Sequence, residues 1–305
     1  MDNDMSGAVV VVGAGLMGRG IAAGFVARGH DTVLLLRDAA AGPQARRQTL
    51  ALVDDLPAAP QRGALLLEPI DGFAGWRDAG LVIESVVEDL AVKQALFAGL
   101  DGRVPDGVPI GSNSSSLPIS RIAQGLGSRA RMFGMHFFMP AHRVPLVEVV
   151  LGADSDPALV RPVCARISAA GRTPVLVRRD IPGFLANRIQ HALMRELLWL
   201  IDSGIASPED IDTAVRHSFG FRYAAIGPVM QREISGWDTT AAAAREIFPT
   251  LCNSAELPDC LERLIAQGHL GMKTGQGFVA WTAESAAATR SAYDRRLTAA
   301  LRLLE

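Results

Sequence analysis

Two short segments, far apart in the chain, contain the residues best suited to chemistry. The first, Val9–Gly18, is an apolar run that ends in a turn with three glycines. The second, Gly134–Pro140, contains His136 and is followed after a short gap by Glu148. A glycine turn after a strand binds the pyrophosphate of a dinucleotide, and a histidine beside a carboxylate accepts a proton. Together the two segments predict hydride transfer coupled to proton transfer, as in the oxidation of an alcohol.

Each glycine of the turn is needed for a different physical reason. Gly13 permits a tight turn out of the strand, Gly15 lets the backbone approach a pyrophosphate, and Gly18 lets the next helix pack closely. That helix begins with Leu16 and Met17, and its first amides would point at the phosphates. Because an apolar strand precedes the turn and an apolar helix follows it, the turn predicts a dinucleotide site.

The histidine segment is expected where ligands bind. His136 lies at the C-terminal end of a predicted strand, the edge at which doubly wound sheets hold their ligands. Glu148 lies on the next predicted strand and could return beside His136. A carboxylate there would fix the tautomer of the imidazole and stabilise the imidazolium. The alternative is a buried histidine that is satisfied by any nearby group.

Two further polar positions could face a substrate. Ser115 belongs to the segment Ser112–Ser116, which follows a strand end, and its hydroxyl could donate to a substrate oxygen or to the nicotinamide amide. The alternative for this segment is a helix cap. Asn187 lies in the first turns of a long predicted helix, where it could face a cleft or remain a solvated amide.

The composition is typical of a cytoplasmic enzyme. The chain has 305 residues and a net charge of -2, which gives no basic footprint for nucleic acid or an acidic membrane. No apolar run reaches the length of a membrane span, and the acidic start differs from a signal peptide. The three cysteines are read as reduced thiols. The six histidines are scattered without metal-ligand spacing, so we expect no metal site.

The chain changes its pattern near residue 181. Before it, short apolar strands alternate with helices, which predicts a doubly wound, mostly parallel sheet. After it, helical periodicity dominates. We therefore expect a dinucleotide-binding domain over 1–181 and an all-helical domain over 182–305. The expected strands are 8–12, 32–37, 81–86, 108–112, 132–137, 146–150 and 173–178, and the expected helices are 16–28, 44–56, 90–100, 157–169, 184–203, one starting at Pro208, 239–248, 258–267 and 283–305.

At these residues the chain resembles the L-3-hydroxyacyl-CoA dehydrogenase family, and the resemblance spans nearly the whole length. Its last segment, Leu270–Phe278, is similar to the family pattern L-G-x-K-T-G-x-G-F. Six segments match in order: the glycine turn, Ser112–Ser116, Gly134–Pro140, Leu146–Val149, Pro182–Arg188 and Leu270–Phe278. The resemblance implies a Rossmann-type domain followed by a helical domain, NAD as cofactor, a homodimer, and a role in fatty acid metabolism.

The resemblance also assigns roles to single residues. It implies that His136 is the proton acceptor and Glu148 its partner, and that Ser115 and Asn187 line the substrate and the nicotinamide. Further cofactor contacts are implied for Glu88, Lys93 and Lys273. The chain has only two lysines, and both fall on family functional positions.

Two departures concern the cofactor. The family asparagine after H-F-F is Met139 here, which removes an amide donor near the nicotinamide. The family acid that reads the adenosine ribose corresponds to Leu36, followed by Arg37 and Asp38. Asp38 could still reach the ribose, or Arg37 could receive a 2′-phosphate, which would favour NADP. We expect NAD, with NADP as the alternative.

A third departure concerns the substrate. The region 44–64, where the family has a basic hairpin that holds CoA, is short here and broken by prolines. Branches of the family that act on free hydroxy acids, such as gulonate dehydrogenase and the lambda-crystallin relatives, have a similarly reduced region. Arg222 lies in a segment similar to the R-Y-A-x-x-G-P of that branch, and could pair with a substrate carboxylate or be a surface arginine.

The first expectation is therefore an NAD-dependent dehydrogenase of 3-hydroxyacyl compounds. Its substrate is a CoA thioester or, alternatively, a small free 3-hydroxy acid. A catalytically weak, crystallin-like dinucleotide-binding protein is a second possibility. A hydroxyacid dehydrogenase with a catalytic lysine is a third. The intact pair of His136 and Glu148 argues against the last two.

Overall fold

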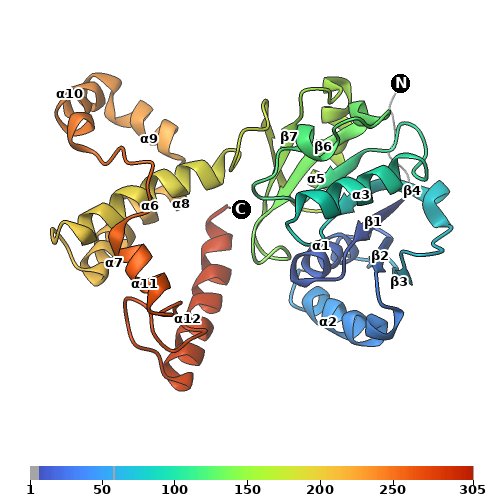
Figure 1. The fold of residues 1–305 in the computed structure, drawn as a ribbon, viewed down its shortest axis with the longest axis horizontal. Helices are drawn as coiled ribbons and strands as arrows, with labels where there is room; N and C mark the ends of the chain where they lie inside the picture. The colour runs from blue at the N-terminus through green and yellow to red at the C-terminus, as the bar shows by residue number, and fades with distance from the viewer. Residues whose placement is uncertain (1–6, 58, 305) are drawn as a thin grey trace. The chain divides into compact units, whose positions relative to one another are not determined.

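The computed structural model describes residues 7–57 and 59–304. The chain forms two compact units, Met1–Arg188 and Ile189–Glu305. Figure 1 shows that the first combines a sheet with helices and that the second is helical. Each unit is described by itself below.

The first unit is built on an eight-stranded sheet in the described residues, with the strand order β3-β2-β1-β4-β5-β6-β7-β8. Every neighbouring pair of strands is parallel except β6 and β7, which are antiparallel. The predicted doubly wound, mostly parallel sheet is confirmed. The strands are β1 (Ala8–Val12), β2 (Thr32–Leu36), β3 (Leu65–Pro69), β4 (Ala79–Glu84), β5 (Ile110–Ser112), β6 (Met132–Phe137), β7 (Leu146–Leu151) and β8 (Thr173–Val177).

Helices cover both faces of this sheet, and the central strand shows why. Val9 and Val11 of β1 belong to one apolar core, and Val10 and Val12 belong to the other. Successive side chains of a strand point to opposite faces, so a strand buried on both faces is apolar throughout. The α-helices of this unit are α1 (Leu16–Ala27), α2 (Gly42–Asp54), α3 (Leu90–Asp101), α4 (Ile119–Ile122) and α5 (Val160–Ala169), and α6 (Ala186–Asp202) begins within it.

The second unit contains helices with a small buried core. Its helix α7 (Pro208–His217) starts as expected, because Ser207 Oγ accepts the backbone amide of Asp210 at 3.1 Å and Pro208 follows the cap. The further helices are α8 (Phe219–Ala225), α9 (Pro228–Ser235), α10 (Trp237–Ile247), α11 (Asp259–Ala266) and α12 (Ala283–Leu301). Within the described part of this unit, the buried residues are Leu198, Ile211, Cys260 and Ala286.

Some elements differ from the sequence expectation. The strand β3 was not expected, because it is a short edge strand that ends in Glu68 and Pro69 and follows a segment with Pro60 and Gly63. The helices α8 and α9 were not expected either. Helix α8 ends at Ala225 and helix α9 begins at Pro228. The dipeptide of Gly227 and Pro228 indicates a turn in the sequence. In the described residues, no helix has both the length and the apolarity needed to cross a membrane.

Candidate active site

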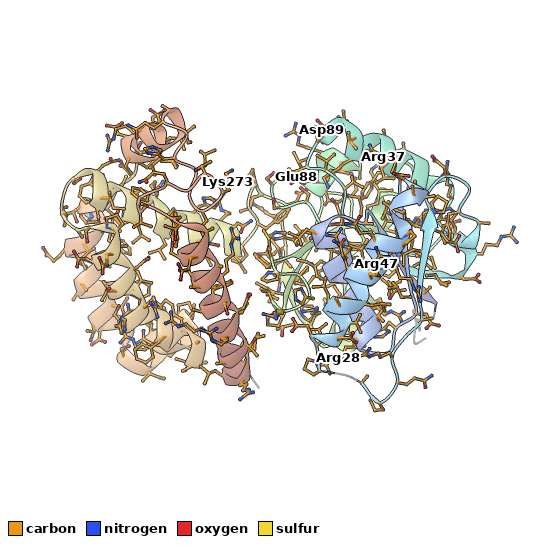
Figure 2. All side chains as sticks on the ribbon, turned by 90° about the horizontal axis from the view of Figure 1, so that it is seen from below. Arg28, Arg37, Arg47, Glu88, Asp89 and Lys273 are labelled. Carbon is orange, nitrogen blue, oxygen red and sulfur yellow. The ribbon has the colours of Figure 1, made fainter. Side chains whose placement is uncertain are left out.

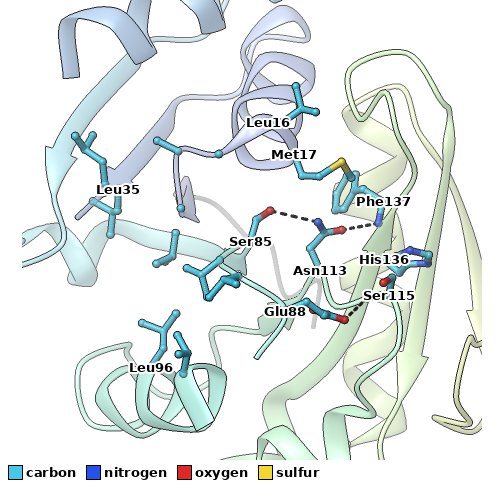
Figure 3. Close-up of a pocket in the computed structure, with 18 of the residues that line it drawn as sticks. Leu16, Met17, Leu35, Ser85, Glu88, Leu96, Asn113, Ser115, His136 and Phe137 are labelled. Carbon is cyan, nitrogen blue, oxygen red and sulfur yellow. Dashed lines mark hydrogen bonds between the residues drawn. The ribbon is translucent and has the colours of Figure 1, made fainter. Parts of the chain in front are cut away.

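A pocket of about 950 Å³ opens at the C-terminal ends of the central strands of the first unit. Its walls come from the glycine turn after β1, the residues after β2 and β4, the segment after β5, and the end of β6 (Figure 3). All of its lining residues belong to the first unit. This is the edge at which a doubly wound sheet binds ligands.

The glycine turn fits a dinucleotide at each glycine. Gly13 has φ +112°, and a Cβ there would lie 2.5 Å from the carbonyl oxygen of Ser85. A Cβ on Gly18 would lie 1.8 Å from the carbonyl oxygen of Gly13, so helix α1 can start against the turn only without a side chain at this position. Above Gly15 the space is open, with no atom within 4 Å of an added Cβ. The turn therefore leaves a bare backbone beside the N-terminus of α1, which is what a pyrophosphate requires.

The histidine and the glutamate meet directly. His136 on β6 and Glu148 on β7 are partners in the antiparallel register, and His136 Nδ1 lies 2.8 Å from Glu148 Oε2. Both side chains are buried, and Glu148 is 0% exposed. Burial alone would raise the pKa of Glu148, but the hydrogen bonds from His136, Ala186 and Leu185 outweigh it and hold the pKa below its ordinary value. The pair is thus a charged carboxylate against an imidazole.

The second oxygen of Glu148 binds the start of helix α6. Glu148 Oε1 accepts the backbone amides of Leu185 at 3.1 Å and Ala186 at 2.7 Å. The chain reaches this position through two residues with positive φ, Gly183 at 74° and Phe184 at 48°. A buried phenylalanine in the left-handed region is strained, and such strain persists where surrounding contacts enforce it. Here the turn aims two amides at the carboxylate.

These contacts determine what His136 can do. An ionised carboxylate only accepts hydrogen bonds, so Nδ1 of His136 carries the proton and Nε2 keeps its lone pair. The ring contacts two phenylalanine rings, Phe138 at a centroid distance of 4.3 Å and Phe184 at 5.7 Å. His136 lines the pocket. The arrangement supplies a proton acceptor in a fixed tautomer and a carboxylate that stabilises the imidazolium.

A second carboxylate organises the segment after β5. Glu88 lines the pocket, and its Oε1 accepts the Ser114 hydroxyl at 2.6 Å and the amides of Ser115 and Ser116 at 3.0 and 3.1 Å. Partial burial would raise the pKa of Glu88, but the Ser114 hydroxyl, the Lys93 ammonium and Ser116 hold it below its ordinary value. Glu88 therefore fixes the backbone on which Ser115 faces the pocket.

Lys93 lies behind Glu88. Its side chain is 1% exposed, and its Nζ lies 2.6 Å from Glu84 Oε1 and 3.4 Å from Glu88 Oε2. Glu84 is 0% exposed and also accepts the Ser112 hydroxyl at 2.6 Å. Lys93 does not line the pocket, so its predicted contact with the cofactor stays a prediction, and its observed contacts are with Glu84 and with Glu88, which does line the pocket.

Sequence reasoning did not single out Asn113. Its Oδ1 accepts the backbone amide of Phe137 at 2.8 Å, and its Nδ2 donates to Ser85 Oγ at 3.3 Å. Asn113 thereby links the ends of β4, β5 and β6 beside His136 (Figure 3). Its position in the serine-rich segment is a signal, since an amide donates and accepts at once where hydroxyl neighbours lie at a strand end.

The other predicted site residues are divided between the two units. Ser115, Asn187, Met139 and Arg37 line the pocket together with Gly13, Gly15, Leu16 and Met17. Asp38 does not line it, because its carboxylate caps a 3-10 turn by accepting the amide of Ala40 at 2.9 Å. Arg222, on α8, and Lys273 belong to the second unit. Their roles stay predictions. Among the described residues, no cluster of three metal-ligating side chains occurs.

Two family models match the chain. The NAD-binding domain of 3-hydroxyacyl-CoA dehydrogenase matches residues 8–181, and the C-terminal domain of 3-hydroxyacyl-CoA dehydrogenase matches residues 183–281.

Curated relatives agree with these models. The 5-formyl-3-hydroxy-2-methylpyridine 4-carboxylate 5-dehydrogenase of Mesorhizobium japonicum is 30% identical over 97% of this chain and 98% of its own length. The 3-hydroxyadipyl-CoA dehydrogenase of Escherichia coli is 33% identical over 90% of this chain, which spans 59% of that longer protein.

Solved structures show the same relationship. A crystal structure of the 5-formyl-3-hydroxy-2-methylpyridine 4-carboxylic acid 5-dehydrogenase, described as an NAD+ dependent dismutase, has a TM-score of 0.91, with 30% identity and 98% of both chains covered. The (S)-3-hydroxybutyryl-CoA dehydrogenase of Ralstonia eutropha has a TM-score of 0.73, with 28% identity over 90% of this chain and 99% of that one. The chain therefore belongs to the 3-hydroxyacyl-CoA dehydrogenase family and is an NAD-dependent dehydrogenase that acts on a CH–OH group.

Proposed function

We propose that this enzyme interconverts the alcohol and carbonyl forms of a small free hydroxy acid, with His136 as general base and general acid. NAD, when bound along the glycine turn, takes up or returns the hydride. In the oxidative direction Nε2 of His136 accepts the hydroxyl proton, and Glu148 stabilises the imidazolium. In the reductive direction the same proton returns to the carbonyl oxygen.

The observation that carries this chemistry is the buried contact of 2.8 Å between His136 Nδ1 and Glu148 Oε2, on a histidine that lines the pocket. Ser115 and Asn187 line the same pocket and supply polar groups for the substrate oxygen and the nicotinamide amide. A merely structural dinucleotide-binding protein has no need of a histidine fixed in one tautomer beside the pocket.

The region after β2 supports a free acid over a CoA thioester. Of its three arginines, Arg46 donates to the carbonyl oxygen of Leu65 at 2.6 Å, and Arg62 pairs with Asp54 at 2.7 Å. Helix α2 ends at Asp54 and Pro57 follows, so the described part of this region forms no long basic hairpin for the phosphates of CoA. The similarity to a pyridine carboxylate dehydrogenase over 98% of both chains also favours a free carboxylate-bearing substrate.

Arg222 is the residue assigned here to the substrate carboxylate. It lies in the last turn of α8. An arginine binds a carboxylate through two parallel hydrogen bonds, and such a charge-assisted contact is worth roughly 1.5–3 kcal/mol, or about 10- to 150-fold in affinity.

A CoA thioester remains the second candidate, because a relative that is 33% identical over 90% of this chain is named a 3-hydroxyadipyl-CoA dehydrogenase. The family models carry the same name. On that substrate His136 and Glu148 would act in the same way, and Arg222 would have no carboxylate to bind at the position of the thioester.

A substrate panel separates the two candidates. The enzyme is assayed by NADH absorbance with short free hydroxy acids, with aromatic hydroxymethyl and formyl carboxylates, and with acetoacetyl-CoA. We expect a free acid to have the highest kcat/KM, and Arg222→Ala to raise its KM by about 10- to 150-fold. Arg216→Ala, which changes an exposed arginine in the last turn of α7, is the matched control and should leave KM unchanged. Efficient reduction of acetoacetyl-CoA with a neutral Arg222→Ala would contradict the proposal.

A further inference from the structure

At the end of β2, where the adenosine ribose is expected, the described lining of the pocket has no acidic residue to bind the ribose 2′-hydroxyl. In dinucleotide-binding folds, an acidic residue near the end of the second strand binds the ribose 2′-hydroxyl of NAD, whereas an arginine nearby accommodates the 2′-phosphate of NADP. In this chain β2 ends with Leu36, and both Leu36 and Arg37 line the pocket.

The position of these two residues is fixed by the sheet. The backbone amide of Gly13 donates to the carbonyl oxygen of Leu35 at 2.8 Å, so the end of β2 lies directly beside the glycine turn. The amide of Ile70 donates to the carbonyl oxygen of Leu36 at 2.9 Å, which holds this end of the strand from its other side. Leu36 and Arg37 therefore occupy the ribose-reading position.

The carboxylates near the end of β2 either bind other groups or lie outside the lining of the pocket. Asp38 is exposed, accepts the amide of Ala40 and does not line the pocket. Glu68 and Asp71, on and after the neighbouring strand β3, do not line it either. The lining carboxylate is Glu88. Glu88 follows β4, which is two strand positions from β2, and its carboxylate is bound to the segment after β5.

Arg37 is available for an anion. It is exposed, and no hydrogen bond or ion pair joins its guanidinium to residues 7–57 or 59–304. Figure 2 shows Arg37 at the same end of this unit as Glu88 and Asp89, with Arg28 at the opposite end. A guanidinium there would meet a 2′-phosphate with its planar fork, while the carboxylate that lines the pocket, Glu88, is bound to the segment after β5.

We propose that the adenosine end of this pocket binds the 2′-phosphate of NADP through Arg37, so that the enzyme uses NADP as well as NAD. Leu36 stands where a carboxylate would accept a hydrogen bond from the ribose 2′-hydroxyl of NAD and repel the 2′-phosphate of NADP. Without that carboxylate, the site no longer disfavours NADP. This assignment concerns the chain's own residues at the end of β2 and does not depend on which alcohol is the substrate.

The test measures binding at equilibrium in the absence of any substrate. Protein is titrated with NADH and with NADPH, whose fluorescence is alike, and the fragments 5′-AMP and adenosine 2′,5′-bisphosphate are titrated by calorimetry. We expect NADPH to bind within about tenfold of NADH, and the bisphosphate to bind at least as tightly as 5′-AMP. NADPH binding more than about tenfold weaker than NADH would overturn the proposal.

Three variants assign the effect to residues. Arg37→Ala should weaken NADPH binding by about 10- to 150-fold, the value of a charge-assisted contact, with a much smaller change for NADH. Leu36→Asp should weaken NADPH relative to NADH by at least about tenfold, and circular dichroism verifies its fold. Arg28→Ala, an exposed arginine at the far end of α1, is the control and should change neither affinity. Equal losses of NADH and NADPH in Arg37→Ala would overturn the role of the 2′-phosphate.

Because these measurements contain no substrate and no turnover, they stand whether or not the enzyme oxidises a free hydroxy acid. Failure of the substrate panel with tight NADPH binding would refute the proposed function alone. Loss of NADPH binding with normal NAD-dependent turnover would refute this inference alone.

Discussion

At the scale of single residues, Glu148 carries more than one function. It accepts three hydrogen bonds, one from the His136 ring, one from the amide of Leu185 just before α6, and one from the amide of Ala186 at its first residue. The first contact sets the tautomer of the base, and all three, the His136 contact most of all, hold the pKa of Glu148 below its ordinary value although it is fully buried. The chemistry of His136 therefore depends on a neighbour that does not itself line the pocket.

His136→Ala should lower kcat by about 100- to 10,000-fold, because the general base is lost. NADH binding should stay nearly unchanged, since the glycine turn and not His136 holds the dinucleotide. Glu148→Gln should lower kcat strongly for a different reason, as a neutral amide no longer stabilises the imidazolium.

Stopped-flow turnover and NADH fluorescence titrations measure the two quantities separately. The control is His217→Ala, whose exposed imidazole contacts the Thr213 carbonyl oxygen of its own helix, and which should leave both unchanged. Near-normal turnover of His136→Ala would refute its role as the base.

At the scale of secondary-structure elements, two carboxylates hold two turns of the chain, one fully buried and one partly exposed. Glu148 holds the start of α6, and Glu88 holds the segment between β5 and α4 through its hydroxyls and amides. The pKa of each is below its ordinary value in the folded protein. Each turn is therefore stabilised only while its carboxylate is ionised.

This predicts a loss of stability in acid that can be assigned to one residue. A carboxylate whose pKa is lower in the folded state stabilises the fold above its unfolded-state pKa, and this contribution is lost as the pH falls through the folded-state pKa. The free energy of unfolding should therefore decrease as the pH falls below about 4.5, the ordinary value for glutamate, and should decrease less steeply in Glu88→Gln.

Urea unfolding at a series of pH values measures this slope. Glu256→Gln changes an exposed glutamate of the helical unit and should keep the wild-type slope. Identical slopes for the wild type and Glu88→Gln would contradict the assignment.

The elements also show how far the sequence could predict the site. The glycine turn, the strand that ends near His136 and the return of Glu148 beside it follow local rules, namely turn chemistry and apolar patterning. The sequence did not predict that Lys93 would be buried between Glu84 and Glu88, because that contact depends on how separate segments meet in space. Nor could it predict the positive φ of Phe184, since phenylalanine disfavours that conformation and only its surroundings enforce it.

Asp38 and β3 show the same limit. The sequence offers Asp38 as a candidate for the ribose, which stays a prediction, and in the structure its carboxylate accepts the amide of Ala40 at the start of a turn. The edge strand β3 contains Glu68 and ends in Pro69, so its composition resembles a loop. Its hydrogen-bonded pairing with β2 makes this segment a strand, although its own residues do not predict one.

At the scale of the whole molecule, the helical unit exposes an unusual amount of apolar surface. Ile234 is 74% exposed, Phe248 70% and Val229 66%, while few residues of the described part of this unit are buried. A soluble monomer rarely keeps so many large apolar side chains in water, and such surfaces mark sites of association. The unit has little core with which to be stable by itself.

We therefore expect a two-fold dimer through the helical unit. Sedimentation equilibrium at micromolar concentration should give twice the mass of the chain. The melting temperature should rise with protein concentration, because association stabilises the folded state by mass action. A concentration-independent melting temperature together with a monomer mass would contradict the expectation. Ile234→Glu, at the most exposed of these apolar side chains, identifies whether α9 is part of the interface.

The helix that Glu148 holds has a consequence for how kinetic variants are read. Helix α6 begins at Ala186 in the first unit and continues to Asp202 in the second, so the amides at its start lie on the segment that joins the two units. The carboxylate of Glu148 thus binds both the imidazole of His136 and the amides on this connecting segment. A variant that removes this carboxylate therefore loses the contact with His136 and the contacts with the amides of Leu185 and Ala186 together, so a fall in its turnover reports on both.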